Sequence, residues 1–328
     1  MKTIKENYKF IIGLLLILLV LNIRFPYYVD APGGISNINE KIEIKGYKSE
    51  GSFNLVYVKE YKSTIPTLLI SFLNKDWKIL KKEDVLLETE NDKSYSFRDK
   101  LLMQESISDA IYVAYIKAAK DIQISTNKLV VAYISPESKT NLNINDEILS
   151  INGVDISSKN EITNIVDKLK VGDKTSIKVR NNKKYYDRYA YVINSDDSKK
   201  IGILISNIKE YKTNPKISIK TNSNESGSSG GLITALSIYN SLVKEDITHG
   251  MTIVGTGTID QDGNVGSIGG VEYKLKSAVK NKADLFIVPK DENYKEAMKL
   301  KKKNKYNIKI IGVSTFDEVI NYLKNVEK

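Results

Sequence analysis

Residues 224–240 read NESGSSGGLITALSIYN, a glycine- and serine-rich turn that runs directly into an amphipathic helix. Leu232, Leu236, Tyr239 and Val243 fall at i, i+4, i+7 and i+11, so they form one buried stripe of that helix. A serine at the start of a helix meets unpaired backbone N–H groups and the positive end of the helix dipole, which could stabilise an oxyanion. Taken alone, the turn fits a flexible helix cap at least as well.

The residues around this helix, 200–328, alternate short apolar runs with helical stretches. We expect strands at 201–205, 217–219, 251–259, 264–268, 285–288 and 308–313. We expect helices from Gly270 to about Lys280, after Pro289, and from Phe316, the last capped by Ser314 or Thr315. Alternation of this kind predicts an α/β domain.

A second glycine-rich stretch, 255–274, reads GTGTIDQDGNVGSIGGVEYK. It is not a dinucleotide fingerprint, because Asp260 stands where the last glycine of G-x-G-x-x-G would fall. The pattern G-x-x-x-x-G-K-[ST] occurs nowhere in the chain, so the sequence predicts no nucleotide phosphate loop and no ATPase. We expect no cofactor.

The chain contains no Cys and a single His, which is His249. These counts exclude a cysteine nucleophile, and they exclude the zinc sites built from several Cys or His residues, so we expect no metal. A Ser-His-Asp triad could use only His249. That residue lies in the polar stretch EDITHGM, where a surface loop histidine is expected.

The formal net charge is +10, from 50 Lys and Arg against 40 Asp and Glu. Lysines are scattered through every segment, and no stretch combines basic and aromatic residues as a nucleic-acid reader does. The densest run, at 299–305, falls on the end of an expected surface helix. We therefore predict a solvated, lysine-rich surface, which an anionic membrane would attract, and no nucleic-acid partner.

An apolar run, FIIGLLLILLVLNI, occupies residues 10–23 and follows Lys2, Lys5 and Lys9. A helix of this length covers roughly 21 Å, whereas a membrane span usually needs about 20 residues. The competing interpretation is a cleaved signal peptide, whose apolar core has this length, but no A-x-A cleavage site follows.

Arg24 can extend its charge towards the interface, and Phe25, Tyr27 and Tyr28 can form an interfacial aromatic belt. We therefore expect a transmembrane helix over 10–29. The positive flank predicts a cytoplasmic tail at 1–9, which would make this a single-pass protein of the cell membrane with its remaining residues outside.

The middle of the chain is expected to hold two β-rich parts. Residues 30–105 show short alternating runs that predict strands, and we find no chemistry in them. Residues 106–197 begin with a helical stretch and contain the words NLNINDEILSINGVDI at 141–156, followed by a helix expected over Ser158 to Leu169. These words resemble a PDZ domain, which implies capture of a peptide end by strand addition. An unrelated β-rich spacer is the alternative.

Together the two glycine-rich stretches resemble the proteolytic domain of Lon-type proteases, and specifically the membrane-anchored PDZ–Lon-like proteins of Gram-positive bacteria. That family carries its nucleophile in a "GPSAG" turn, ends a strand with "TGT" or "TGE", and places a catalytic lysine four residues after "IGG". Here the turn is GSSGG at 227–231, the strand motif is Thr256-Gly257-Thr258, and IGGVEYK ends at Lys274. The resemblance is close over about residues 200–328, and the anchor and the PDZ-like region match the family's arrangement as well. We therefore expect a Lon-like proteolytic domain over 198–328.

The family register selects Ser229 over Ser228 as the nucleophile, because the "GL" and "L-x-I-Y" words then fall at the family's spacing. The resemblance implies that Lys274 is the general base, with a pKa lowered by burial, and that Thr256 hydrogen-bonds near the lysine or the oxyanion. The chain departs from the family at Ser228, where Pro is usual, and at Gly230, where Ala is usual.

The expected architecture is therefore an α/β (α+β) Lon-type proteolytic domain, preceded by a β-rich PDZ-like domain and a transmembrane helix. The expected function is an ATP-independent, membrane-anchored serine endopeptidase that cleaves unfolded or exposed polypeptides outside the membrane. The resemblance also raises a homo-oligomeric ring, a common assembly of Lon-type domains. Two alternatives stay open: a catalytically inactive, membrane-tethered PDZ scaffold that binds peptides, and a basic nucleic-acid binder with steeply salt-dependent affinity.

Overall fold

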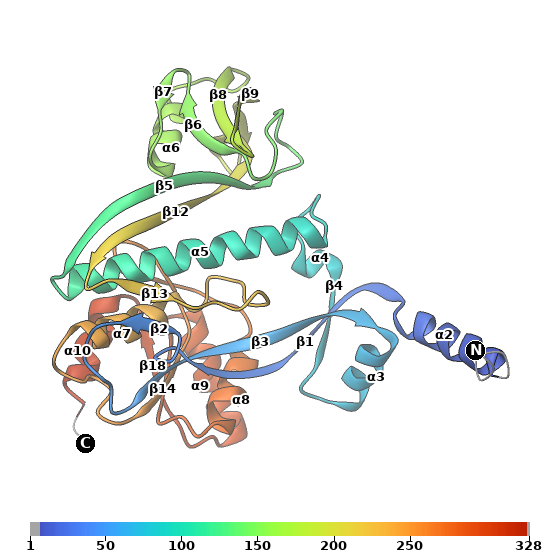
Figure 1. Cartoon of the computed structure of the whole chain (residues 1–328), viewed down its shortest axis with the longest axis vertical. Coiled ribbons are helices and arrows are strands. Elements are labelled where there is room, and N and C mark those ends of the chain that lie inside the picture. Colours follow the sequence, from blue (N-terminus) through green and yellow to red (C-terminus); the bar gives the residue numbers. More distant parts are fainter. Residues whose placement is uncertain (1–6, 327–328) are drawn as a thin grey trace.

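The computed structural model describes residues 7–326, which form two domains that meet along a long helix (Figure 1). A three-layer α/β domain is built from two separate stretches of chain, residues 24–117 and 217–324. A smaller β-rich domain, residues 121–214, is inserted between them. The N-terminal helix α2, Tyr8–Leu21, projects from the three-layer domain.

The central sheet of the three-layer domain has six strands in the order β18-β17-β14-β3-β1-β4. Their bounds are Lys309–Val313, Leu285–Pro289, Thr252–Gly255, Ser52–Thr64, Arg24–Asn37 and Lys78–Lys81. Strands β3, β14, β17 and β18 are parallel, whereas β1 pairs antiparallel with both β3 and β4. The N-terminal strands therefore complete the same sheet as the C-terminal ones.

Strict alternation along the sheet explains the three layers. In β17, Leu285 and Ile287 point to one face and Phe286 and Val288 to the other, and all four are buried. The first face packs on α5, α7 and α10, which span Asp92–Lys117, Gly231–Leu242 and Phe316–Lys324. The second face packs on α8 and α9, which span Val271–Lys280 and Glu292–Asn304. A strand covered on both faces has an apolar side chain at every position.

The inserted domain has a five-stranded antiparallel path, β12-β5-β6-β8-β9, with the short β7 beside β6. These strands span Ile203–Asn214, Asp121–Ile134, Glu147–Ile151, Lys174–Asn181, Lys184–Tyr191 and Val154–Asp155. Helix α6, Lys159–Asp167, closes the core and is capped by the side chain of Ser158, as expected. The long β5 and β12 pair along their whole length and lie against α5.

The remaining elements are short. Strand β2, Ile42–Ile44, pairs with β13, Ile217–Ile219, and β15, Thr258–Ile259, pairs with β16, Val265–Gly266. A further ribbon joins β10, Ile193–Ser195, to β11, Ser198–Lys200. Helices α3, Ile65–Leu73, and α4, Lys82–Val85, flank β4. The β2–β13 ribbon ties the two stretches of the three-layer domain together on the side of α7 (Figure 1).

The structure differs from the expected span of residues 10–29 in its second half. Helix α2 ends at Leu21, and β1 begins at Arg24 because Tyr28 and Val29 are buried in the central sheet. Within residues 7–326, no helix combines the length and the apolar composition that crossing a membrane requires. Most of the expected tail at 1–9, including Lys2 and Lys5, lies outside the described residues.

Two expected boundaries also differ. The division at residue 106 falls inside α5, which begins at Asp92, where Asn91 accepts hydrogen bonds from the N–H groups of Lys93 and Ser94. The region expected at 30–105 is not a separate part, since β1 and β3 are inner strands of the three-layer domain. The strand expected at 251–259 breaks into β14 and β15, and this break shapes the site described next.

Candidate active site

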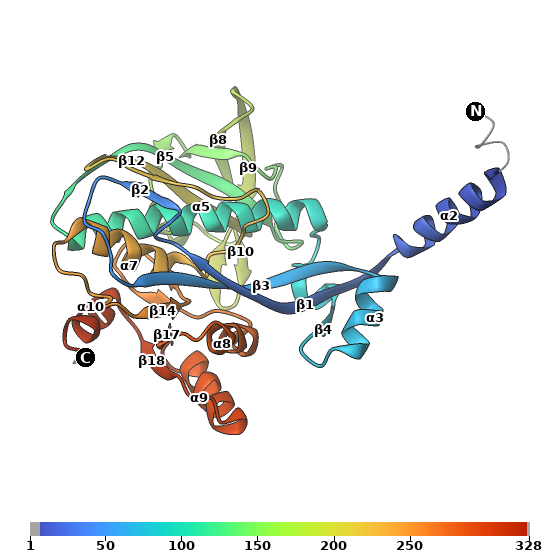
Figure 2. The same ribbon diagram turned by 60° about the horizontal axis from the view of Figure 1, so that its bottom comes forward.

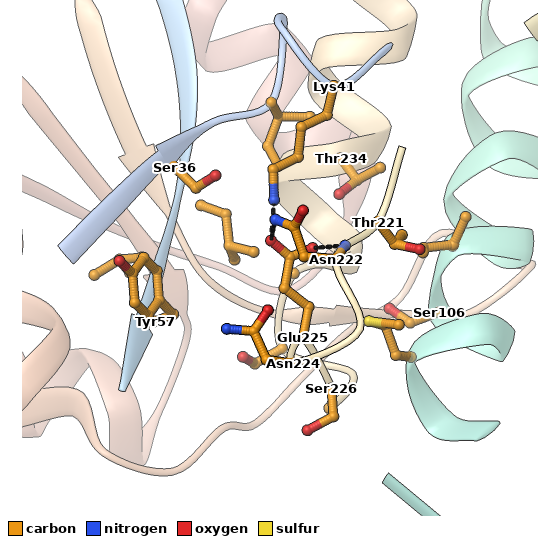
Figure 3. A pocket seen from close by; sticks show the side chains of 18 of the residues that line it. Ser36, Lys41, Tyr57, Ser106, Thr221, Asn222, Asn224, Glu225, Ser226 and Thr234 are labelled. Carbon is orange, nitrogen blue, oxygen red and sulfur yellow. Dashed lines mark hydrogen bonds and ion pairs between the residues drawn. The ribbon is translucent and has the colours of Figure 1, made fainter. Parts of the chain in front are cut away.

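A cleft of about 650 Å³ opens beside the turn that precedes α7. Its walls come from β1, from β3, from α5 and from the loop between β13 and α7. The side chains named in Figure 3 surround it, with Tyr57 on the strand side and Ser106 on the α5 side. Ser229 lines this cleft, while Ser228 is not among its lining residues in the described part of the chain. The cleft therefore favours Ser229 over Ser228 as the serine that a ligand would meet.

Helix α5 forms two hydrogen bonds with the backbone of the turn. The hydroxyl of Ser106 donates to the carbonyl of Ser228 at 2.9 Å, and the N–H of Gly227 donates to the carbonyl of Asp99 at 3.0 Å. Gly227 has φ +87°, a conformation that favours glycine. Gly231 must also be glycine, since a Cβ there would lie 2.5 Å from the Ser106 hydroxyl.

The N-terminus of α7 presents donors to the cleft. In the part of the chain that the structure describes, the N–H groups of Ser229 and Gly230 donate to no protein acceptor. Both residues line the cleft, and both stand at the positive end of the α7 dipole. Such a pair of N–H groups can bind an oxyanion that forms on a substrate.

Lys274 lies in the middle of α8 and is only 4% exposed. Burial lowers the pKa of its amine to about 8, because the charged form loses its hydration. Its Nζ donates a hydrogen bond to Thr256 Oγ1 at 3.0 Å. A buried lysine without a carboxylate partner can serve as a base near neutral pH.

Thr256 joins the lysine to the turn. Its hydroxyl donates to the backbone carbonyl of Ser229 at 3.1 Å, and the N–H of Gly257 donates to the same carbonyl at 2.8 Å. Between β14 and β15 the N–H of Thr256 still donates to Ile287 in β17 at 3.0 Å, whereas the N–H of Gly257 leaves the sheet and binds the turn. No direct hydrogen bond joins the Ser229 hydroxyl to Lys274 among the described residues. The structure thus brings Ser229, Thr256 and Lys274 together through the Ser229 backbone.

An ion pair stands among the residues that line the cleft. Lys41 pairs with Glu225, and the side-chain amide of Asn222 donates to the same carboxylate at 2.8 Å (Figure 3). These contacts hold the pKa of Glu225 below its usual range, against the opposing effect of burial. Because Glu225 lies four residues before Ser229, the pair ties the loop that carries the serine to the segment before β2.

Strand β3 offers an open edge to the cleft. It pairs with β14 only through residues 52–55, while its pairing with β1 continues to residue 64. Residues 55–61 of β3 line the cleft. An extended peptide could therefore add to this edge as a strand and pass in front of Ser229.

His249 takes no part in the cleft. Its Nε2 forms a hydrogen bond with the carbonyl of Leu323 in α10 at 2.8 Å. This contact gives the histidine a structural role, in which its loop is attached to α10. Among residues 7–326, no cluster of three or more acidic or histidine side chains is placed to hold a metal ion.

Several residues that shape the cleft were not found by sequence reasoning. Ser106 was read only as part of a helix, and Lys41 and Tyr57 lie in the region where no chemistry was expected. No local pattern marks them, because their importance comes from contacts across the fold. The structure explains why Gly230 can stand where the family usually has alanine. A Cβ at Gly230 would lie 3.1 Å from Leu55 Cδ1, so Leu55 occupies the space of the alanine methyl group.

Residues 207–325 match the family model described as the Lon protease (S16) C-terminal proteolytic domain, and residues 121–187 match the model of the PDZ domain. Among solved structures, the PDZ domain of the SdrC-like protein from Listeria monocytogenes is similar to this chain. The two are 19% identical, the match covers 25% of this chain and 92% of that chain, and the TM-score is 0.23. None of the curated proteins compared matches the chain.

The chain thus combines a peptide-binding PDZ domain with the proteolytic domain of a serine peptidase. This combination is that of a PDZ–Lon-like protease, as the two glycine-rich stretches predicted. The inserted domain is the PDZ domain, and the three-layer domain is the Lon-type proteolytic domain. The latter also includes β1, β3 and α5, which lie outside the matched residues.

Proposed function

We propose that this protein is an ATP-independent serine endopeptidase in which Ser229 is the nucleophile and Lys274 the general base. One observation carries the proposal: a buried lysine is hydrogen-bonded through Thr256 to the backbone of a serine that lines a cleft. The lowered pKa of Lys274, about 8, keeps a useful fraction of the amine neutral near neutral pH.

Thr256 sets the direction of proton transfer. Its own proton is committed to the Ser229 carbonyl, so towards Lys274 it acts as an acceptor. A neutral lysine amine gives one N–H to Thr256 and keeps its lone pair for the Ser229 hydroxyl. No hydrogen bond joins these two side chains among the described residues, and catalytic hydrogen bonds of this kind often form only when substrate is present.

The reaction then follows with each proton accounted for. Lys274 takes the Ser229 proton while Oγ attacks the scissile carbonyl, and the N–H groups of Ser229 and Gly230 bind the oxyanion. The resulting ammonium gives its proton to the leaving amine as the peptide bond breaks. Lys274, neutral again, takes a proton from water, whose oxygen attacks the acyl-enzyme. The ammonium then returns that proton to Ser229 Oγ as the bond between Oγ and the acyl carbon breaks, which frees the second product and restores the enzyme.

The open edge of β3 favours polypeptides in extended form. A folded protein buries its own strands, so unfolded or exposed segments are the substrates that this edge can pair with. The chain carries no nucleotide phosphate loop, and hydrolysis of the acyl-enzyme needs none. The PDZ domain would supply peptide ends to the cleft.

We also place the protein at a membrane, held by α2, with the PDZ and proteolytic domains outside the cell. The support is that α2 buries none of its residues in the protein and is apolar from Phe10 to Leu21. An apolar helix of which the protein buries no residue is most stable within lipid. Purification of the full chain with the membrane fraction, and its release only by detergent, is the expected result.

Casein degradation by the full chain in detergent tests the peptidase. We expect cleavage without ATP and no cleavage by Ser229→Ala, with Ser228→Ala retaining activity. A requirement for ATP, or equal activity in Ser229→Ala, would contradict the proposal.

One observation favours an alternative, an inactive peptide-binding scaffold: among the described residues no hydrogen bond joins the Ser229 hydroxyl to Lys274. A fluorophosphonate probe decides between the two. Labelling that disappears in Ser229→Ala supports the peptidase, whereas unlabelled protein that still binds peptides supports the scaffold.

A further inference from the structure

Helix α3 exposes an apolar face that the protein does not cover. Leu69, Ile70, Phe72 and Leu73 are 57%, 44%, 77% and 88% exposed. At about 100° per residue these four side chains fill one continuous arc of the helix, and the buried Ser71 lies on the opposite side. Soluble proteins rarely leave so many large apolar side chains together in water, so this face points to a partner.

The fold holds α3 rigidly in place. Its first turn is closed by Thr64 and Thr67, whose hydroxyl accepts from the Thr64 N–H at 2.7 Å. The segment after it is pinned by Trp77, which stacks on Tyr61 of β3 with ring centroids 5.5 Å apart. The exposed apolar face of α3 is therefore part of an ordered helix with a fixed position, and not of a mobile loop.

Helices α2 and α3 approach each other at one end of the molecule, and α2 then runs away from α3 (Figure 2). The side chains of α2 are exposed as well, including Phe10 at 73% and Leu19 at 68%. The two helices therefore place their apolar surfaces at the same end of the molecule, away from the PDZ domain (Figures 1 and 2). A single lipid phase could take up both.

The charge around α3 selects among lipids. From residue 59 to residue 82 there are six lysines against two acids, Glu60 and Asp76. Asp76 is neutralised by Lys276, whose Nζ lies 2.6 Å from its carboxylate. Exposed lysines, among them Lys75 and Lys78, follow α3 directly. A second hollow of about 310 Å³ is lined by β1 together with Lys62, Lys82 and Asp92. It adds the cation Arg24 to this region, while Lys62 pairs with Asp92 at 2.7 Å. Basic residues at the margin of an apolar helix attract anionic headgroups.

We propose that α3 and the lysines around it form a docking surface for an anionic phospholipid bilayer. The apolar face of α3 enters the headgroup region, and the lysines contact lipid phosphates. This surface acts in addition to α2 and needs no property of the cleft, so it stands or falls independently of the peptidase chemistry. It also does not require α2 to cross the bilayer. Its consequence is a fixed orientation of the proteolytic domain against the membrane.

The absence of Cys from the chain allows a direct test with single labels. Full-length Leu73→Cys would carry an environment-sensitive fluorophore in nanodiscs that hold one chain each, made of phosphatidylcholine with about 30% phosphatidylglycerol. Val171→Cys, at a site in the PDZ domain that is 58% exposed, is the matched control. We expect spin-labelled lipid to quench the label at 73 at least threefold more than the label at 171, and aqueous iodide to do the reverse.

Two comparisons complete the test. Replacement of Lys75, Lys78 and Lys81 by Gln, or of phosphatidylglycerol by phosphatidylcholine, should at least halve the lipid quenching at residue 73. Equal iodide quenching at 73 and 171 would overturn the proposal. Protection of residue 73 that appears only when a disc holds two chains would assign the face to a second copy and would equally overturn it. A Phe72→Cys label guards against a local effect of the substitution at 73.

Discussion

The two sides of the candidate dyad are positioned by different forces. Ser229 lies in a turn rich in glycine and serine, half-exposed at the cleft, and is held by hydrogen bonds to its backbone from Thr256 and Gly257. Lys274 lies in a regular helix, is 4% exposed, and is held by packing between α8 and the sheet. The serine depends on polar contacts from other elements, and the lysine depends on burial.

This difference teaches where each half of the site is vulnerable. Burial of an amine disfavours its charged form, so the lysine lowers stability while a larger fraction of its amine is neutral near neutral pH. The turn buries no charge. When a residue that donates a hydrogen bond to the turn is replaced, the turn loses only that hydrogen bond. Substitutions at the lysine should therefore alter activity and stability in opposite directions, and substitutions around the turn should lower both.

Lys274→Met has the largest expected effect. Loss of the base should reduce kcat by about 10²–10⁴-fold. Because the pKa falls from 10.5 in the unfolded chain to about 8 in the fold, the charged lysine opposes folding at pH 7. Its replacement should raise the free energy of unfolding by roughly 2–3 kcal/mol. Peptide cleavage and urea unfolding at pH 7 measure the two changes.

The sign of the stability change has its own check. Between pH 8 and 10.5 the unfolded chain binds a proton at Lys274 that the folded chain lacks, so wild-type stability should rise with pH in that window. Lys274→Met should lose that rise, while Lys280→Met, at the exposed end of the same helix, should keep it. If Lys274→Met were instead less stable than the wild type, the polar contacts of the lysine would outweigh the cost of burying its charge.

Thr256→Val should have the second largest effect. The substitution keeps the size of the side chain but removes the hydroxyl that joins Lys274 to the Ser229 carbonyl. We expect kcat to fall by about 10–100-fold, with KM nearly unchanged, because two hydrogen bonds that orient the base and the turn are lost. Thr252→Val, at the start of β14, is the control and should leave kcat within about twofold. Equal losses in the two variants would remove Thr256 from the site.

Between pH 6.5 and 8.5 kcat/KM should rise by about 25-fold, because only the neutral amine of Lys274 accepts a proton. Activity should rise with pH and level off above about 8, the pKa of Lys274. Glu60 also lines the cleft, and burial raises its pKa to about 7. A Glu60→Gln variant separates the two groups: the inflection near 8 should remain. Its disappearance would assign the profile to Glu60.

Whether a feature depends on local or on long-range interactions decides whether the sequence could predict it. The helices α7 and α8 and the cap of α10 at Thr315 were predicted close to their observed bounds, since periodicity and capping are local signals. The family matches confirm the PDZ and Lon-type domains. The start of α5 at Asp92 was missed because residues 92–105 carry no clear apolar stripe.

Long-range relations account for the rest. That β3 lies beside β14 depends on Leu55 meeting Gly255, two residues 200 positions apart. No periodicity records such a pairing, so residues 30–105 looked like a separate part without chemistry. Thr256 was expected near the lysine or the oxyanion from the family pattern, and its observed bond selects the lysine. The assignment of Ser229 and Lys274 as a working dyad stays a prediction until the variants are measured.

Ser106→Ala should have the smallest effect and tests the turn from the side of α5. It removes the hydroxyl that binds the Ser228 carbonyl at 2.9 Å, at a cost of about 1 kcal/mol in stability. Ser108→Ala is the matched control, since Ser108 is equally buried on α5 but accepts from the N–H of Lys209 in β12 instead. Both variants should lose similar stability, yet only Ser106→Ala should lower kcat, by about threefold, because it alone loosens the backbone next to Ser229. If kcat fell equally in both, the contact from α5 would serve the fold and not the position of the serine.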